Sequence, residues 1–380
     1  GSGIVKISYP SEQWTNVSPA TNPELRPRTT SSQPLVWAPW NPRMLLTGMQ
    51  YVMATIDGGA HWKKLSPDLG YPKGVKPPAD TATPVPGAAP GGAIETISAS
   101  SVGRGTIWAG TNNGLIKVTR DEGKTWADVT IPGLPNPTRA LVEMIDASHT
   151  DAGGAYVAVD LLRAGDYTPY IYRTHDFGKT WTLITNGLPK NQPSGSVARG
   201  VRADPKRAGL LVAGTESGMH VSFNDGDDWQ SLQLNLPNTS YRDIAFRDND
   251  LVVGTYGRGI FILDDYAVLR QMTPAVADEA VHLFKPDPTV RVRRNVNADT
   301  PLPPEVPHAL NPLDGVIIHY SLASRPSGDI TIDVKDSAGR AVRHLSSAPI
   351  APVPEAARPP HPNFWVATPT PLSTNVGTNR

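Results

Sequence analysis

Three carboxylates stand near the starts of short apolar runs that we expect to be the first strands of successive repeats: Glu95, Glu143 and Asp243. Hydrolysis of a glycosidic bond needs two carboxyl groups, one as general acid and one as nucleophile or base, roughly 5 to 10 Å apart. These residues could supply such a pair if the fold brings the strand starts together. They are the candidate catalytic residues.

Seven further residues are candidates for contacting a ligand. They lie near strand starts or in the turns between the second and third expected strands of a repeat. Arginine can grip a carboxylate through two hydrogen bonds, and tyrosine offers both a ring and a hydroxyl. No local motif marks the arginine set and tyrosine nucleophile of a sialidase-type site. The candidates are Arg139, Asp166, Tyr167, Arg199, Arg242, Tyr256 and Arg258.

An acidic motif recurs four times without gaps: Ser or Thr, any residue, Asp or Asn, any residue, Gly, two residues, Trp. A carboxylate or amide can accept backbone N–H bonds across a tight turn, glycine tolerates a positive φ, and tryptophan fills space between sheets. Because the motif appears once per repeat, we interpret it as architectural rather than catalytic. Its members are Asp57, Gly59, Trp62; Asp121, Gly123, Trp126; Asp176, Gly178, Trp181; and Asn224, Gly226, Trp229.

The spacing of these motifs predicts propeller blades. The acidic positions are 64, 55 and 48 residues apart, which suits four short strands with variable loops. Each motif follows two β-branched runs separated by a turn, as in 106–110 and 115–118. A fifth unit at 251–263 leads to Asp264 and Asp265 without the glycine and tryptophan. The predicted fold is all-β, a propeller of four-stranded blades followed by a small β-sandwich.

The motif resembles the Asp-box, or BNR, repeat of sialidases, sortilin-type propellers and reducing-end-specific cellobiohydrolases. The segments 92–97, 167–174 and 254–265 further resemble large bacterial sortilin-like proteins often labelled glycosyl hydrolase, and the likeness covers about residues 34–380. The motif identifies the fold more than the activity. The resemblance implies a secreted or periplasmic protein, although the chain shows no signal peptide.

The predicted organisation has a propeller and a second, smaller β domain. Segments 4–8 and 13–17 read as the last two strands of a blade, so about five and a half blades are expected, as an open arc or a strained ring. The segments 315–322, 329–335 and 341–345 alternate as half-buried strands do. The predicted parts are 1–33, half blade and link; 34–265, blades; 266–290, connector with a short helix that ends at Pro274; 291–346, partial immunoglobulin- or fibronectin-like sandwich; and 347–380, proline-rich tail.

Composition argues against several classes of function. Thirty-five basic residues balance 35 acidic ones, so no basic field would gather nucleic acid or an anionic membrane. The chain has no cysteine and no apolar run long enough to span a bilayer. No zinc helix, nucleophile elbow or phosphate loop is present, and residues 224–228 lack the spacing of a calcium loop. We therefore predict no metal and no cofactor.

Two hypotheses remain open. In the first, the propeller is an extracytoplasmic scaffold that binds a peptide or a glycan, with further blades and domains of the intact protein as neighbours. In the second, it is a glycoside hydrolase whose carboxylate pair lies in the propeller channel. The second needs one carboxyl group in a dry setting that raises its pKa.

Overall fold

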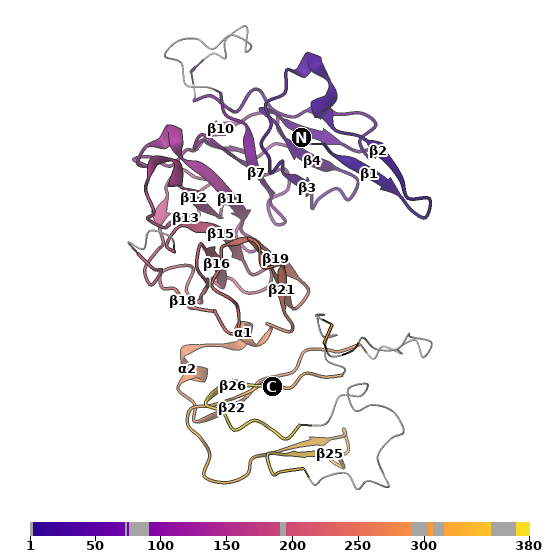
Figure 1. The fold of residues 1–380 in the computed structure, drawn as a ribbon, viewed down its shortest axis with the longest axis vertical. Helices are drawn as coiled ribbons and strands as arrows, with labels where there is room; N and C mark the ends of the chain where they lie inside the picture. The colour runs from indigo at the N-terminus through magenta and orange to yellow at the C-terminus, as the bar shows by residue number, and fades with distance from the viewer. Residues whose placement is uncertain are drawn as a thin grey trace. The chain divides into compact units, whose positions relative to one another are not determined.

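The computed structural model describes residues 3–72, 74–75, 91–190, 195–290, 303, 305–306, 315–350 and 370–380. The chain divides into two compact units, Gly1–Leu263 and Asp264–Arg380 (Figure 1). The first unit contains most of the strands, and the second contains short strands and both α-helices. Within the described residues, no helix is long and apolar enough to cross a membrane.

Successive antiparallel sheets make up the first unit, and each is formed by strands that are consecutive in the chain. Sheet 1 contains β3 (Leu35–Trp37), β4 (Leu45–Gly48), β5 (Val52–Thr55) and β6 (Lys63–Lys64); sheet 2 contains β7 (Ile94–Ala99), β8 (Ile107–Thr111), β9 (Ile116–Thr119) and β10 (Ala127–Asp128). Sheet 3 contains β11 (Leu141–Ala147), β12 (Ala155–Asp160), β13 (Tyr170–Thr174) and β14 (Thr182–Leu183); sheet 4 contains β15 (Ala198–Ala203), β16 (Leu211–Thr215), β17 (Met219–Ser222) and β18 (Gln230–Ser231). Sheet 5 contains β19 (Tyr241–Arg247), β20 (Asp250–Thr255) and β21 (Ile260–Leu263).

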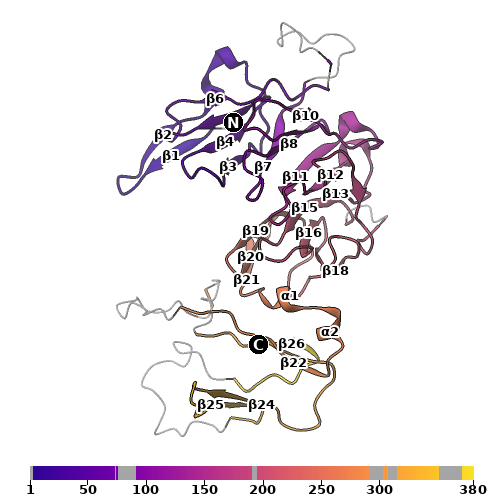
Figure 2. The same cartoon turned by 180° about the vertical axis from the view of Figure 1, so that it is seen from behind.

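These sheets pack face to face as the blades of a β-propeller, which confirms the predicted fold class. The first strand of each sheet contacts the first strand of the next, in the order β3, β7, β11, β15, β19 (Figure 2). Apolar side chains fill the space between neighbouring sheets. Trp108 and Ile145 are buried in one such layer, and Ile171 and Leu211 in the next. The short 3-10 helices Pro19–Thr21, Pro23–Leu25, Pro137–Arg139 and Leu162–Ala164 lie in connecting segments.

The motif turns connect the third and fourth strands of sheets 1 to 4, and all four have the same geometry. In the turn after β9, Thr119 Oγ1 donates to Asp121 Oδ1 at 2.8 Å and accepts from Gly123 N at 3.0 Å. Asp121 Oδ1 also accepts from Thr125 N at 2.9 Å. The Thr125 hydroxyl donates to Asp121 Oδ2 at 2.6 Å, and this bond, with those from Thr125 N and the Thr119 hydroxyl, lowers the pKa of Asp121 to about 2. Gly123 has a φ of +91°, as the turn was predicted to require.

Each motif tryptophan binds the preceding sheet. The indole Nε1 of Trp126 donates to Leu65 O at 3.0 Å, and that of Trp181 donates to Val129 O at 2.8 Å. Trp62 makes the same bond to Val17 O at 2.7 Å, directly after the hairpin of β1 (Val5–Ser8) and β2 (Gln13–Asn16). Sheet 1 therefore makes the same tryptophan contact with this hairpin as sheets 2 and 3 make with the sheets that precede them.

The second unit holds two short helices and two small antiparallel sheets. Helices α1 (Val268–Gln271) and α2 (Pro274–Ala277) precede a sheet of β22 (Val281–Leu283), β23 (Tyr320–Leu322) and β26 (Gly377–Asn379). Strands β24 (Thr331–Lys335) and β25 (Ala341–Ser346) form the other sheet. An immunoglobulin- or fibronectin-like sandwich remains a prediction, because residues 291–302, 307–314 and 351–369 lie outside the described residues.

The expected short helix is present as α1, which ends at Gln271, before Pro274. Pro274 then starts α2, where the Thr273 side chain accepts a hydrogen bond from Val276 N. Two strands lie in segments for which no strand was predicted. The predicted connector contains strand β22. The predicted tail ends in a strand, since Gly377 pairs with Leu322. Strand pairing between segments distant in the chain leaves no local pattern that would reveal these two strands.

Candidate functional site

Each first strand of sheets 2 to 5 is interrupted by a β-bulge near its start. The pairing of β7 with β8 shifts between Ile94 and Thr96, so Glu95 has no direct partner. The same shift occurs in the following sheets, between Val142 and Met144, Ala198 and Gly200, and Tyr241 and Asp243. A bulge bends the strand and redirects the side chain of its extra residue. The four extra residues are all charged: Glu95, Glu143, Arg199 and Arg242.

The bulges surround a cavity of about 420 Å³. All four bulged residues line it, although they come from four different sheets. Sheet 1 contributes an apolar wall from β3 and the residues before it. The lining consists of Ser32, Pro34, Leu35, Val36, Glu95, Thr96, Ile97, Glu143, Met144, Arg199, Arg202, Arg242 and Asp243.

Arg199 is buried at the centre of this group and binds three carboxylates. Its Nη1 contacts Glu143 Oε1 and lies 2.5 Å from Asp160 Oδ2, while its Nε donates to Glu216 Oε1. The Arg199 side chain is only 5% exposed. One guanidinium is thus shared among three acidic groups, so its hydrogen-bonding capacity is largely used within the protein.

The pKa values in this cluster follow from burial and from the excess of acid. Burial lowers the pKa of Arg199, but the carboxylates of Asp160, Glu143 and Glu216 outweigh it and the net pKa is raised. Burial raises the pKa of Glu143, the charge of Arg199 offsets only part of that rise, and the nearby Asp160 carboxylate adds to it. The cavity is therefore rich in negative charge around a guanidinium that stays protonated.

A second set of equivalent positions supports the bulges. In each of sheets 2 to 5, one residue of the second strand pairs with the first-strand residue that follows the bulge. The residue two positions further along the chain is, in sheet order, Asn112, Asp160, Glu216 or Tyr256. Arg199 bonds Asp160 of the preceding sheet and Glu216 of its own. Arg242 repeats this pattern, because Nη2 lies 3.4 Å from Glu216 Oε1 and its guanidinium lies over the Tyr256 ring, 5.0 Å from the centroid. Each arginine thus bridges two sheets.

Glu95 and Asp243 have no ion-pair partner within 4.0 Å in the described part of the chain. Burial raises the pKa of Glu95, while the Thr30 hydroxyl, the charge of Arg163 and Ser32 act in the opposite direction. The Thr30 hydroxyl is buried yet makes no hydrogen bond of ordinary geometry with any described residue. Asp243 Oδ1 accepts only from the adjacent Ile244 N, at 2.9 Å. These two carboxylates are the available acidic groups of the cavity.

The structure brings together five of the ten candidate residues, namely Glu95, Glu143, Arg199, Arg242 and Asp243. Tyr256 touches the group through Arg242. The other four candidates do not line the cavity. Arg139 donates to Arg163 O at 2.7 Å, and Asp166 accepts from Tyr170 Oη at 2.7 Å, so both have structural partners. Tyr167 and Arg258 are exposed in turns.

Sequence reasoning missed three charged residues of the site. Arg202 lines the cavity and binds Asp146 Oδ1 at 2.9 Å and Ile244 O at 3.0 Å. Asp160 and Glu216 anchor Arg199. The sequence did offer a clue to Asp160 and Glu216, because they occupy the same position in their repeats as the candidate residue Tyr256. Nothing in the sequence singles out Arg202, which lies three residues beyond the bulge.

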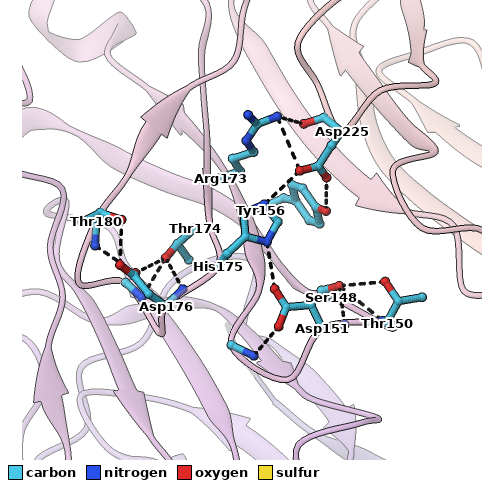
Figure 3. A network of polar contacts seen from close by, with 12 residues as sticks. Ser148, Thr150, Asp151, Tyr156, Arg173, Thr174, His175, Asp176, Thr180 and Asp225 are labelled. Atoms are coloured by element: carbon cyan, nitrogen blue, oxygen red, sulfur yellow. Dashed lines mark hydrogen bonds and ion pairs between the residues drawn. The ribbon is translucent and has the colours of Figure 1, made fainter.

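A second polar cluster lies at the motif turns and joins sheet 3 to sheet 4 (Figure 3). Asp225 accepts from Tyr156 Oη at 2.5 Å, and His175 Nε2 lies 2.9 Å from its Oδ2. His175 Nδ1 lies 2.8 Å from Asp151 Oδ2. Burial lowers the pKa of His175, but these two carboxylates outweigh it and the net pKa is raised. The cluster thus ties neighbouring sheets together. Among the described residues, no group of His, Asp and Glu is arranged to hold a metal ion.

Comparison with known proteins yields structural likeness alone. No protein-family model matches the chain, and no curated protein matches it. Among solved structures, a GH74 enzyme from Niastella koreensis is 19% identical with a TM-score of 0.47, over 69% of this chain and 41% of that one. The GH74 xyloglucanase from Xanthomonas campestris is 18% identical with a TM-score of 0.44, over 60% and 36%. The β-propeller domain of Cps50 (Swd1) from Myceliophteria thermophila is 12% identical with a TM-score of 0.41, over 62% and 67%.

The chain spans well under half of the length of the two GH74 proteins. At these identities the likeness concerns the fold and no residue of the site.

Proposed function

We propose that this propeller is a binding scaffold that captures a peptide in the cavity formed by the bulges. The observation that carries the proposal is the convergence of four charged bulge residues, one from each of sheets 2 to 5, on one cavity of about 420 Å³. A cavity of this size suits two or three residues of a peptide. The resemblance of the repeats to sortilin-type propellers supports the same reading, with an extracytoplasmic location.

The chemistry of the lining favours a peptide over a glycan. Its polar groups carry both signs of charge, and Leu35, Val36 and Met144 add apolar surface. No aromatic ring is among the described residues that line the cavity, so these residues offer a sugar ring no flat face on which to stack. A peptide presents charged, apolar and backbone amide groups that match all three kinds of surface.

The test is selection from a phage-displayed library of random dodecapeptides on the chain of 380 residues, alongside binding to a panel of labelled oligosaccharides. We expect peptides to be enriched, and their affinity to change at least about tenfold in Arg242→Ala, because this change removes a charged side chain that lines the cavity.

The matched control is Arg104→Ala, because Arg104 lies beyond the other end of β7, is exposed and pairs with the exposed Glu122. Peptides that bind the Arg104 and Arg242 variants equally would place the binding surface elsewhere. Failure to enrich any peptide, together with binding of an oligosaccharide, would refute the proposal.

A specific observation also favours a glycoside hydrolase as a second candidate. The pKa of both Glu95 and Glu143 is raised by burial, and a general acid for glycosidic cleavage needs such a shift. The hydrolysis of labelled oligosaccharides by the chain and by its Glu95→Gln and Asp243→Asn variants tests it. Turnover that either change abolishes would establish the hydrolase, whereas a panel without turnover would favour binding.

A further inference from the structure

We infer that the cavity recognises a cationic side chain, a lysine or arginine of the bound peptide, whose head group lies between the carboxylates of Glu95 and Asp243. This inference rests on the proposed function, since it specifies what the peptide must carry. It follows from the distribution of charge, from the groups left without partners and from the shape of the apolar wall.

The arginines of the cavity are already neutralised by the protein. Arg199 is bound by Glu143, Asp160 and Glu216, and Arg202 binds Asp146. Arg242 contacts Glu216 as well. Three guanidinium groups thus face four carboxylates before Glu95 and Asp243 are counted. An anionic ligand would have to compete with these internal carboxylates for the arginines, whereas a cation meets two carboxylates without ion-pair partners.

Glu95 is half-buried and lines the cavity. The nearby Thr30 hydroxyl favours the ionised form of its carboxyl group, which is the form that attracts a cation. An ammonium or guanidinium group carries several N–H donors and can satisfy more than one such acceptor. Among the described residues, Arg163 is the charged residue that lowers the pKa of Glu95, and its charge does not remove the rise that burial causes.

The apolar wall suits the stem of a long cationic side chain. Pro34, Leu35 and Val36 from sheet 1 line the same cavity as Glu95, together with Ile97 and Met144. Lysine and arginine bury their methylene stems against apolar surface while the charged head reaches a polar partner. A lysine side chain would therefore use both kinds of surface in this cavity.

The test compares two small probes by NMR titration: Nα-acetyl-lysine methylamide and its uncharged analogue Nα-acetyl-norleucine methylamide. We expect the lysine probe to bind at least about tenfold more tightly, because a hydrogen bond to a charged group is worth about a factor of ten. The ratio should fall towards one in the Glu95→Gln, Asp243→Asn double variant. Affinity for the lysine probe should also rise with pH as Glu95 loses its proton.

Glu122→Gln is the matched control, since Glu122 is exposed and contacts Arg104 outside the cavity; circular dichroism checks that each variant is folded. Equal binding of the two probes, or no binding of either at millimolar concentration, would overturn the cationic inference. Peptides selected from the library that carry no lysine or arginine would do the same and leave the proposed peptide binding intact. If the library yields no peptide at all, the proposed function itself fails.

Discussion

The motif turns of sheets 1 to 4 and the first-strand bulges of sheets 2 to 5 lie at opposite ends of the strands, and they differ in what is repeated from sheet to sheet. At the motif turns the side chains repeat: Thr55, Thr119, Thr174 and Ser222 each accept a hydrogen bond from the motif glycine. At the bulges only the backbone repeats, while the side chain changes from glutamate to arginine between sheets 3 and 4. A side chain that recurs in every blade serves the blade. Different side chains on a recurring backbone feature can build an asymmetric site.

Differences in side chain between equivalent positions of the sheets indicate a binding site only where those positions line a cavity. Two residues before each motif, the third strands carry Met53, Lys117, Tyr172 and His220, which differ as much as the bulge residues do. These side chains are buried or half-buried within the sheets, and Lys117 Nζ is paired with Asp128 at 2.6 Å. The comparison therefore predicts different consequences for substitutions at the three kinds of position.

The largest effect is expected at the bulges. Arg199→Ala would leave Glu143 and Asp160 buried without their cation, and removal of one partner of a buried ion pair typically costs about 3–5 kcal/mol. Urea denaturation followed by tryptophan fluorescence measures the loss. Arg247→Ala is the control, because Arg247 is 85% exposed and should change stability by less than about 0.5 kcal/mol. Equal midpoints for the two variants would show that the Arg199 cluster is not a buried ion network.

His220 is expected to make stability depend on pH. Its ring nitrogens are buried without hydrogen-bond partners among the described residues, and burial lowers the pKa of His220 to about 4. The unfolded chain takes up this proton near pH 6.5, so the free energy of unfolding should fall by up to about 3 kcal/mol as pH drops from 6.5 to 4. The His220→Leu variant should lack this part of the pH dependence of the free energy of unfolding. A variant that retains the wild-type slope would contradict a neutral, buried His220.

At a motif turn, Gly123→Ala is expected to destabilise the protein by more than about 1 kcal/mol, because φ is positive and an added Cβ would lie 2.5 Å from Leu65 O. Gly133→Ala is the control, since its φ is also positive but nothing lies within 4 Å of the added Cβ. The difference between their urea midpoints isolates the contact with the preceding sheet. No difference would mean that this contact yields without loss of stability.

The smallest effect is expected from a change that one blade already contains. Asp121→Asn should be nearly neutral at pH 7, because Asn224 accepts the same backbone hydrogen bond from Asp228 N at 3.0 Å. Asp121→Ala should lower the thermal midpoint slightly further. Because the pKa of Asp121 is lowered to about 2, its contribution is present above the unfolded value near 3.8 and is lost as pH falls towards 2. A larger loss for asparagine than for alanine would contradict the architectural role.

The sequence by itself determined the blade. The hydroxyl, acidic or amide, and glycine residues of the motif interact within a few positions of one another, so their identity and spacing specify the turn and the positive φ of its glycine. The alternation of apolar runs and turns likewise predicted four-stranded sheets. Five residues of the cavity were also predicted, since a charged residue near the start of a first strand is visible in each of sheets 2 to 5.

Only the tertiary structure decided which of these charges remain available. Arg199 is separated from Glu143 by 56 residues and from Asp160 by 39, so no local pattern reveals that they neutralise one another. The bulges, and the availability of Glu95 and Asp243, depend on pairing between strands and on packing between sheets. The strands β22 and β26 were missed for the same reason, because a short strand is stabilised by partners that the local sequence does not contain.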